Sequence, residues 1–140
     1  MTHPFGTEIT DAEVRALFAA AQGWEARYKQ LIKLAKQLPP LAEEHRVDAN
    51  AIHGCESQAW LLAEQDAQER WQFHCDSDAR IVKGLMAVVL AAISNKTSAE
   101  IAAFDMDTYF EELQLLNHLS PSRGNGLRAV VSAIKAKAES

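Results

Sequence analysis

The apolar and polar positions near the start of the chain follow a helical spacing. From Trp24 to Leu38, apolar residues recur at every third or fourth position and define one face, and Pro39-Pro40 then stops the pattern. A shorter helix is expected before it. That helix would run from the Thr10-Asp11-Ala12-Glu13 capping box to about Ala21, with Gly23 separating the two.

The pattern turns toward sheet in the middle of the chain. Residues 59–65 predict a strand with Trp60 and Leu62 on one face and Leu61 and Ala63 on the other. Residues 70–75 alternate with the period of two that is typical of strands, and residues 67–69 supply a turn between the two stretches. The second stretch places Trp71, Phe73 and Cys75 on one face, and Gln72 and His74 on the other. These features predict an antiparallel hairpin. A third strand, ending near Ile52 or His53, is expected to complete a stable sheet.

The most apolar stretch follows this hairpin. Residues 79–94 predict a helix with candidate N-caps at Asp76-Ser77-Asp78, and its apolar residues cover too much of the circumference for a surface helix. A second capping box at Thr97 opens a short helix to about Phe104, Asp107 is expected to cap the next, and Ser120-Pro121 to begin the last. The expected inner faces are Phe110, Leu113 and Leu116 in the first of these last two helices, and Leu127, Val130, Val131 and Ile134 in the second.

These elements predict the α+β class, with a small three-stranded antiparallel sheet packed against several helices. The other segments add little regular structure: residues 1–9 predict an irregular arm and residues 41–49 a weak helical piece. The chain contains no repeat, linker or low-complexity segment. Residues 1–140 are therefore expected to form a single domain, long enough to bury its own core.

Composition and charge exclude several classes of protein. The formal net charge of -5 argues against a nucleic-acid binder, which normally carries a basic face. The apolar run from Ile81 to Ile93 is too short to span a bilayer, which takes roughly 20 residues. No secretory signal is visible at the N-terminus, and two cysteines 20 positions apart form no disulfide framework. A cytoplasmic protein with a free thiol is expected, bound neither to nucleic acid nor to a membrane.

Cys55 is the candidate for chemistry. Gly54 precedes it and polar residues follow it, and a glycine beside a cysteine is typical of a turn that can project the thiol outward. The alternative is a buried cysteine that only fills space. Cys75 shares an apolar face with Trp71 and Phe73, so a structural role is expected there.

Three motifs resemble those of the SufE/CsdE family of sulfur acceptors. The stretch Gly54-Cys55-Glu56-Ser57-Gln58-Ala59-Trp60 resembles the family signature G-C-x-S-x-x-W. Asp76-Ser77-Asp78-Ala79-Arg80 resembles the segment that opens its central helix, and Leu119-Ser120-Pro121-Ser122-Arg123 begins a segment similar to L-S-x-S-R-x-x-G-L. The opening His3-Pro4-Phe5-Gly6-Thr7 is closer to the CsdE branch.

The resemblance implies a SufE/IscU-like fold and a persulfide carrier rather than a stand-alone enzyme. Cys55 would accept sulfur from a cysteine desulfurase of the CsdA or SufS kind and stimulate that enzyme. The sulfur would then pass to iron–sulfur cluster assembly or another sulfur-requiring pathway, through a scaffold or a CsdL-like protein. No bound cofactor or metal is implied, because pyridoxal phosphate belongs to the desulfurase and the cargo is a transient persulfide on Cys55.

Five neighbours of the thiol are candidate site residues: His53, Gly54, Glu56, Ser57 and Arg123. His53, if protonated and close, would lower the thiol pKa, or it would only satisfy a strand hydrogen bond. Glu56 stands where the family commonly has glutamine, and a nearby carboxylate raises a thiol pKa. The family pattern places Arg123 near the thiol, where a guanidinium can steady a thiolate or pair with a carboxylate of the partner. Its alternative is a loop arginine that caps carbonyls.

Two rival functions use the same residues. A zinc site could draw on His53, Cys55, His74 and Cys75, but adjacent strand residues point to opposite faces, so at most three could converge. A thiol-dependent hydrolase would need a histidine base and a third orienting residue, and the sequence identifies no such third residue.

The cations of the first long helix also have two interpretations. Arg27, Lys29, Lys33 and Lys36 lie largely off its apolar face. They form either a solvated surface or a docking surface for an acidic partner.

Overall fold

The core is built around helix α3 (Arg80–Ile93). The structure is a computed structural model that describes residues 3–54 and 57–139. Every residue of α3 except Arg80 and Lys83 is buried, as its apolar circumference predicts. Helix α2 (Gly23–Gln37) crosses it closely, because Gly84 has no side chain to hold the two backbones apart.

The sheet has the order β1-β2-β3 and is antiparallel within the described residues. Strands β1 (Ala59–Gln65) and β2 (Arg70–Ser77) confirm the predicted hairpin, with Leu61 opposite Cys75 and Leu62 opposite His74. As predicted, Trp71, Phe73 and Cys75 face the core.

The third strand is not where the sequence pattern placed it. Strand β3 (Lys96–Thr97) follows α3 and pairs with the start of β2. The segment near Ile52 makes only an isolated bridge, between Ala51 and Trp60. A 3-10 turn (Asp48–Asn50) lies just before that bridge, and the positive φ of Gly54 turns the chain away after it. The extended piece is therefore too short to become a strand.

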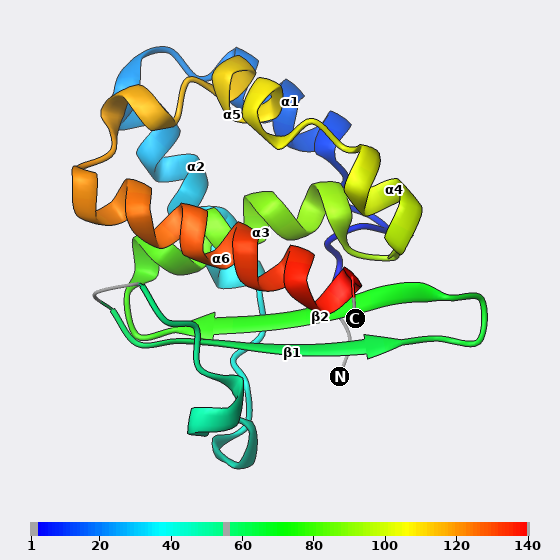
Figure 1. The fold of residues 1–140 in the computed structure, drawn as a ribbon. Coiled ribbons are helices and arrows are strands. Elements are labelled where there is room, and N and C mark those ends of the chain that lie inside the picture. The colour runs from blue at the N-terminus through cyan, green and yellow to red at the C-terminus, as the bar shows by residue number, and fades with distance from the viewer. Residues whose placement is uncertain (1–2, 55–56, 140) are drawn as a thin grey trace.

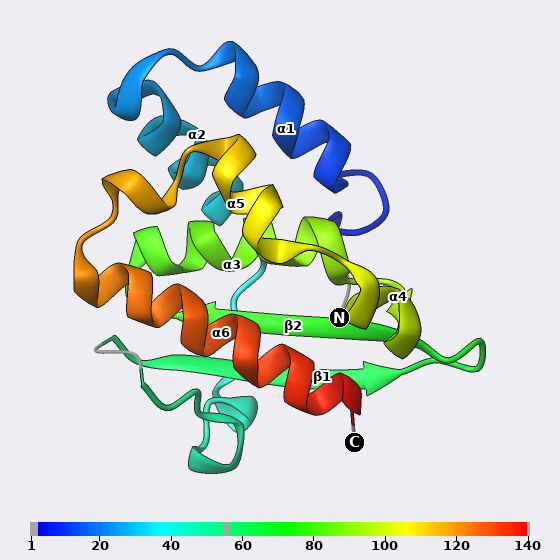
Figure 2. The same cartoon turned by 45° about the horizontal axis from the view of Figure 1, so that its top comes forward.

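The other helices are α1 (Asp11–Ala20), α4 (Ser98–Ala103), α5 (Met106–Leu113) and α6 (Pro121–Glu139). The helices lie together on one face of the sheet, and the segment between α2 and β1 passes to the other face (Figures 1 and 2). That segment holds two short 3-10 turns in place of the weak helical piece. The N-terminal arm is irregular, as expected, and is anchored by the buried side chain of Phe5.

Helix caps were predicted with mixed success. The Thr97–Glu100 capping box forms, and Ser120 Oγ accepts a hydrogen bond from the amide of Arg123. The capping box predicted at Thr10 is wrong, because the Thr10 side chain makes no cap hydrogen bond. Thr10 is still the N-cap position of α1. Asp107 was also wrong as a cap. Asp105 caps α5 instead, by accepting from the amide of Thr108 at 3.1 Å.

The contact at Gly84 gives a test of the core. A Cβ atom at this position would lie 2.5 Å from the carbonyl oxygen of Leu31 on α2, and backbone cannot move aside cheaply. We expect Gly84→Ala to lower the free energy of unfolding by about 1–3 kcal/mol, measured by urea denaturation.

Gly124 on α6 is the matched control for this substitution. Among the described residues, none outside its own helical turn comes within 4 Å of an added Cβ, so Gly124→Ala should leave stability unchanged or raise it by up to ~1 kcal/mol. Equal effects of the two substitutions would show that the crossing of α2 and α3 is not the constraint.

Candidate functional site

The site predicted from the sequence lies in the loop between the Ala51 bridge and the start of β1. Cys55 and Glu56 themselves lie outside the described residues, so the site is defined by its flanks. The amide of Ile52 donates to the carbonyl oxygen of Ala59 at 2.8 Å, and both residues are buried. The two ends of the loop that holds the thiol position are therefore joined at its base.

One flank of this loop lies against α6. Gly54 has φ +91°, a left-handed conformation that side chains disfavour, and the nearest atom to an added Cβ is the side chain of Ala129 at 3.5 Å. The backbone conformation therefore requires glycine here, although the space would admit a methyl group. His53 and Gly54 are both exposed.

The other flank is fixed to the connection between β2 and α3. Gln58 donates its amide to Asp78 Oδ1 at 3.1 Å, and the amide of Asp78 donates back to Gln58 O at 3.2 Å. Ser77 Oγ donates to the same carbonyl at 2.7 Å. Ser57 is half-buried beside this anchor. These bonds occupy Asp78, which the sequence had suggested as a helix cap.

Asp76 holds the preceding segment against the sheet. Its side chain is only 2% exposed and accepts hydrogen bonds from the amides of Leu41 and Ser77, both at 2.9 Å. It also pairs with Arg46 at 2.5 Å and with Lys83 at 3.2 Å. Burial alone would raise the pKa of this carboxyl, but the two amides and Lys83 outweigh it and hold the pKa below its usual value.

Cys75 offers no second reactive thiol. It is 1% exposed within the core, and burial, with a smaller contribution from Asp76, raises its pKa far above that of an ordinary cysteine. The neutral thiol is a poor nucleophile. This matches the structural role expected from its apolar face.

The structure places Arg123 in the first turn of α6, with an exposed side chain. Within residues 3–54 and 57–139, that side chain makes no hydrogen bond or ion pair, and neither does His53. Arg123 lies on the same helix as Ala129, which adjoins Gly54, but no hydrogen bond or ion pair joins the Arg123 side chain to the described flanks.

The residues proposed for zinc do not come together in the described part of the chain. His53 is exposed on the loop, whereas Cys75 faces the core. His74 lies on the opposite face of β2 and packs edge-on against His3, with ring centroids 5.4 Å apart. Within the part of the chain that the structure describes, no three His, Cys, Asp or Glu side chains lie close enough together to hold a metal ion.

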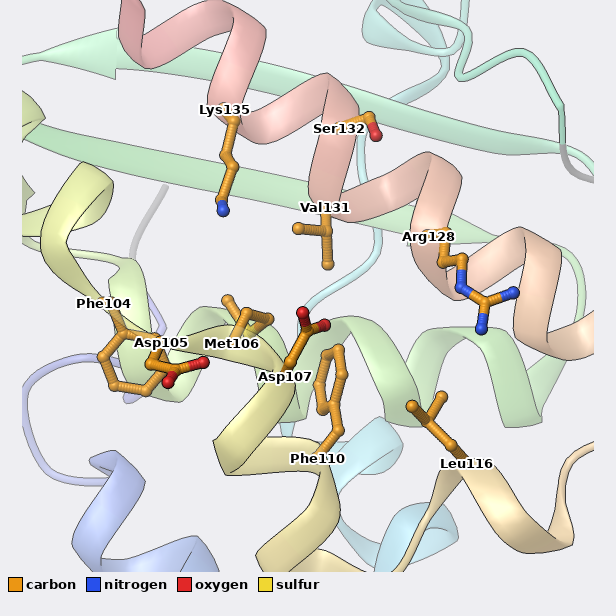
Figure 3. A pocket seen from close by; sticks show the side chains of 10 residues that line it. All are labelled: Phe104, Asp105, Met106, Asp107, Phe110, Leu116, Arg128, Val131, Ser132 and Lys135. Atoms are coloured by element: carbon orange, nitrogen blue, oxygen red, sulfur yellow. The ribbon is translucent and has the colours of Figure 1, made fainter.

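A hollow of about 340 Å³ lies away from the loop, between α5 and α6. Figure 3 shows the apolar side chains of Phe110 on α5 and Val131 on α6 pointing toward each other, with Lys135 and Asp107 reaching toward the hollow from the two helices. Arg128 and Val131 line this hollow, whereas Ala129 contacts the loop at Gly54. The hollow and the loop therefore lie on different faces of α6.

Comparisons with known proteins agree on one family. Residues 12–138 match the family described as "SufE: Fe-S metabolism associated domain". The chain belongs to the SufE family. Within it, the chain is 45% identical over 132 residues to the sulfur acceptor protein CsdE of Escherichia coli (strain K12), and the match covers 94% of this chain and 90% of that protein. This likeness places the chain in the CsdE branch of the SufE family.

The fold is also found in a solved structure. The solution structure of a hypothetical protein from Thermus thermophilus superposes with a TM-score of 0.74 at 17% identity, and the match covers 99% of this chain and 96% of that one. The predicted α+β fold is thus confirmed. Among the helices that the structure describes, none has the length and apolar character needed to cross a membrane.

Sequence reasoning did not identify the anchors of the loop. Asp76 and Asp78 were interpreted as helix caps, because acidic residues just before an apolar helix usually have that role. The cap position is Ala79 instead, and it has no side-chain cap bond. The predicted hairpin itself could have identified these anchors. In an antiparallel hairpin the last residues of the second strand lie beside the first residues of the first strand, as Ser77 lies beside Ala59.

The environment of Asp76 predicts an acid-sensitive contribution to stability. We expect Asp76→Asn to lower the free energy of unfolding by about 1–3 kcal/mol at neutral pH, because Lys83 and Arg46 lose their charged partner. The folded pKa lies below the unfolded value of about 3.9, so the contribution is complete above that value and is lost as pH falls through the folded pKa.

Urea denaturation between pH 7 and pH 3 checks this expectation. The difference between wild type and Asp76→Asn should shrink toward the acid end. Asp48→Asn, a change at an exposed carboxylate, serves as the control. A difference that stays constant with pH would contradict the role assigned to the ionised carboxylate.

Proposed function

We propose that this protein is a sulfur acceptor that takes sulfur onto Cys55 from a pyridoxal-phosphate-dependent cysteine desulfurase. The observation that carries the proposal is its membership of the SufE family, with 45% identity to the sulfur acceptor CsdE over nearly the whole chain. The G-C-x-S-x-x-W motif supplies Cys55, and the other cysteine is buried and protonated. One reachable thiol is chemically sufficient for this function.

The transfer is a thiol–persulfide exchange. The Cys55 thiolate attacks the terminal sulfur of the persulfide on the desulfurase and forms a new S–S bond. The S–S bond of the donor breaks, and the donor cysteine leaves as a thiolate. One S–S bond forms as another breaks, so no oxidant or reductant is consumed. Breaking the carbon–sulfur bond of free cysteine is left to the cofactor of the desulfurase.

The anchored flanks suit this exchange. Ile52 and Gln58 are fixed to the sheet and to the β2–α3 connection, while His53 and Gly54 are exposed between these points. Short fixed flanks let a donor meet the thiol position without unfolding the sheet. Arg123, and His53 when it is protonated, are proposed to favour the thiolate, whereas the Glu56 carboxylate would oppose it and Ser57 would add a polar group beside it.

Loading would also stimulate the desulfurase, because removal of the persulfide frees the enzyme for another turnover. The sulfur then passes to a protein of iron–sulfur cluster assembly or of another sulfur-requiring pathway, such as a scaffold or a CsdL-like protein. The protein is in this view a carrier without a resident cofactor. A reducing cytoplasm would keep the Cys55 thiol free between rounds.

Intact mass after incubation with a desulfurase and cysteine tests the proposal. Wild type should gain the mass of one sulfur atom, and reductant should remove it. Cys55→Ser should gain nothing and should not stimulate cysteine turnover. Cys75→Ala is the matched control and should load as wild type does, because its thiol is buried. Loading of Cys55→Ser would exclude this site.

Arg123 is tested separately by the rate of loading. We expect Arg123→Ala to slow persulfide transfer by about tenfold, the value of one charge-assisted hydrogen bond of ~1.5 kcal/mol. Arg128→Ala removes the same charge from the other face of α6 and should have little effect. Equal rates for the two variants would mean that Arg123 is only a surface residue.

A further inference from the structure

A basic surface covers one side of an otherwise acidic protein. Residues 26–41 contain four cations and no acidic residue, although the formal net charge of the chain is -5. Lys29, Lys33 and Lys36 are exposed on α2, at a spacing that places them along one face of the helix. The buried residues Leu31 and Leu34 lie on its other face.

The surface continues onto α3 through a small hollow. Between the two helices lies a space of about 230 Å³, lined by the apolar side chains of Ile32 and Ala35 and by the cations Lys36, Arg80 and Lys83. Lys83 is already paired with Asp76. Over the described residues, Lys36 and Arg80 form no ion pair with any carboxylate. The hollow therefore presents two uncompensated cations beside apolar side chains.

This hollow adjoins the anchored flank of the thiol loop. Arg80 lies two residues after Asp78, which exchanges backbone and side-chain hydrogen bonds with Gln58. The close crossing of α2 and α3 at Gly84 holds Lys36 on the same side. A protein that brings a persulfide to position 55 must therefore also approach this region.

We propose that the basic surface formed by Lys29, Lys33, Lys36 and Arg80 docks an acidic segment of the desulfurase, with one carboxylate entering the hollow between Lys36 and Arg80. This inference rests on the proposed acceptor function and adds the chemistry of the partner surface. Opposite charge on the partner raises the rate of encounter and orients it before the persulfide reaches the thiol. A carboxylate fits a hollow that already holds two cations and no free acid.

Charge reversal separates docking from chemistry. The double variant Lys36→Glu/Arg80→Glu is compared with Arg128→Glu/Lys135→Glu, which changes the net charge equally on the far face of α6. Stimulation of the desulfurase is measured against acceptor concentration. We expect the first variant to need about tenfold more protein for half-maximal stimulation at low salt, with a similar maximal rate. The deficit should shrink at high salt, which screens exposed charges.

Each outcome decides between the two proposals. The docking surface is overturned if both double variants reach half-maximal stimulation of the desulfurase at the same concentration, whether or not that concentration is higher than for wild type. Inorganic polysulfide should load Cys55 equally in both variants and leave the buried Cys75 unloaded, which shows that each is folded with an intact thiol. If wild type accepts no sulfur from the desulfurase at all, the acceptor function fails. If it loads normally while the first double behaves as wild type, only the docking surface fails.

Discussion

The buried carboxylate of Asp76 is the interaction on which the arrangement around position 55 depends. Four groups from three parts of the chain converge on it: the amides of Leu41 and Ser77, Arg46 and Lys83. A buried charge is tolerated only when it is paired and hydrogen-bonded. Moving any of these partners away would leave the buried carboxylate without that compensation and destabilise the fold. The segment that leads from α2 to the thiol loop is thereby fixed to the sheet and to the central helix.

Anchoring of the loop follows from this arrangement. The strand that ends at Asp76 and Ser77 continues into Asp78, which fixes Gln58 on the far flank of the loop. Gly54 closes the near flank against α6. A carrier needs its reactive position to be presented to a partner without loosening the fold behind it. Two fixed flanks, with His53 and Gly54 exposed between them, satisfy both needs.

The sequence predicted the elements better than their contacts. The hairpin, the buried helix α3 and the last helix followed from periodicity, since apolar spacing depends only on local geometry. The third strand was misplaced, because β3 has two residues and its pairing with β2 is decided by where α3 ends. The roles of Asp76 and Asp78 were missed for the same reason: Leu41 and Arg46, which bind Asp76, and Gln58, which binds Asp78, lie 20 or more positions away. The proposal of Cys55 as the reactive thiol came from a motif, and periodicity carries no information of that kind.

The burial of Cys75 has a consequence for how cargo leaves the protein. A persulfide with a second accessible thiol in the same chain can collapse into an internal disulfide and release sulfide. This chain has two cysteines, and the second is sealed in the core. A loaded carrier of this design cannot discharge itself, so unloading has to be bimolecular and its timing is set by whichever thiol arrives from outside.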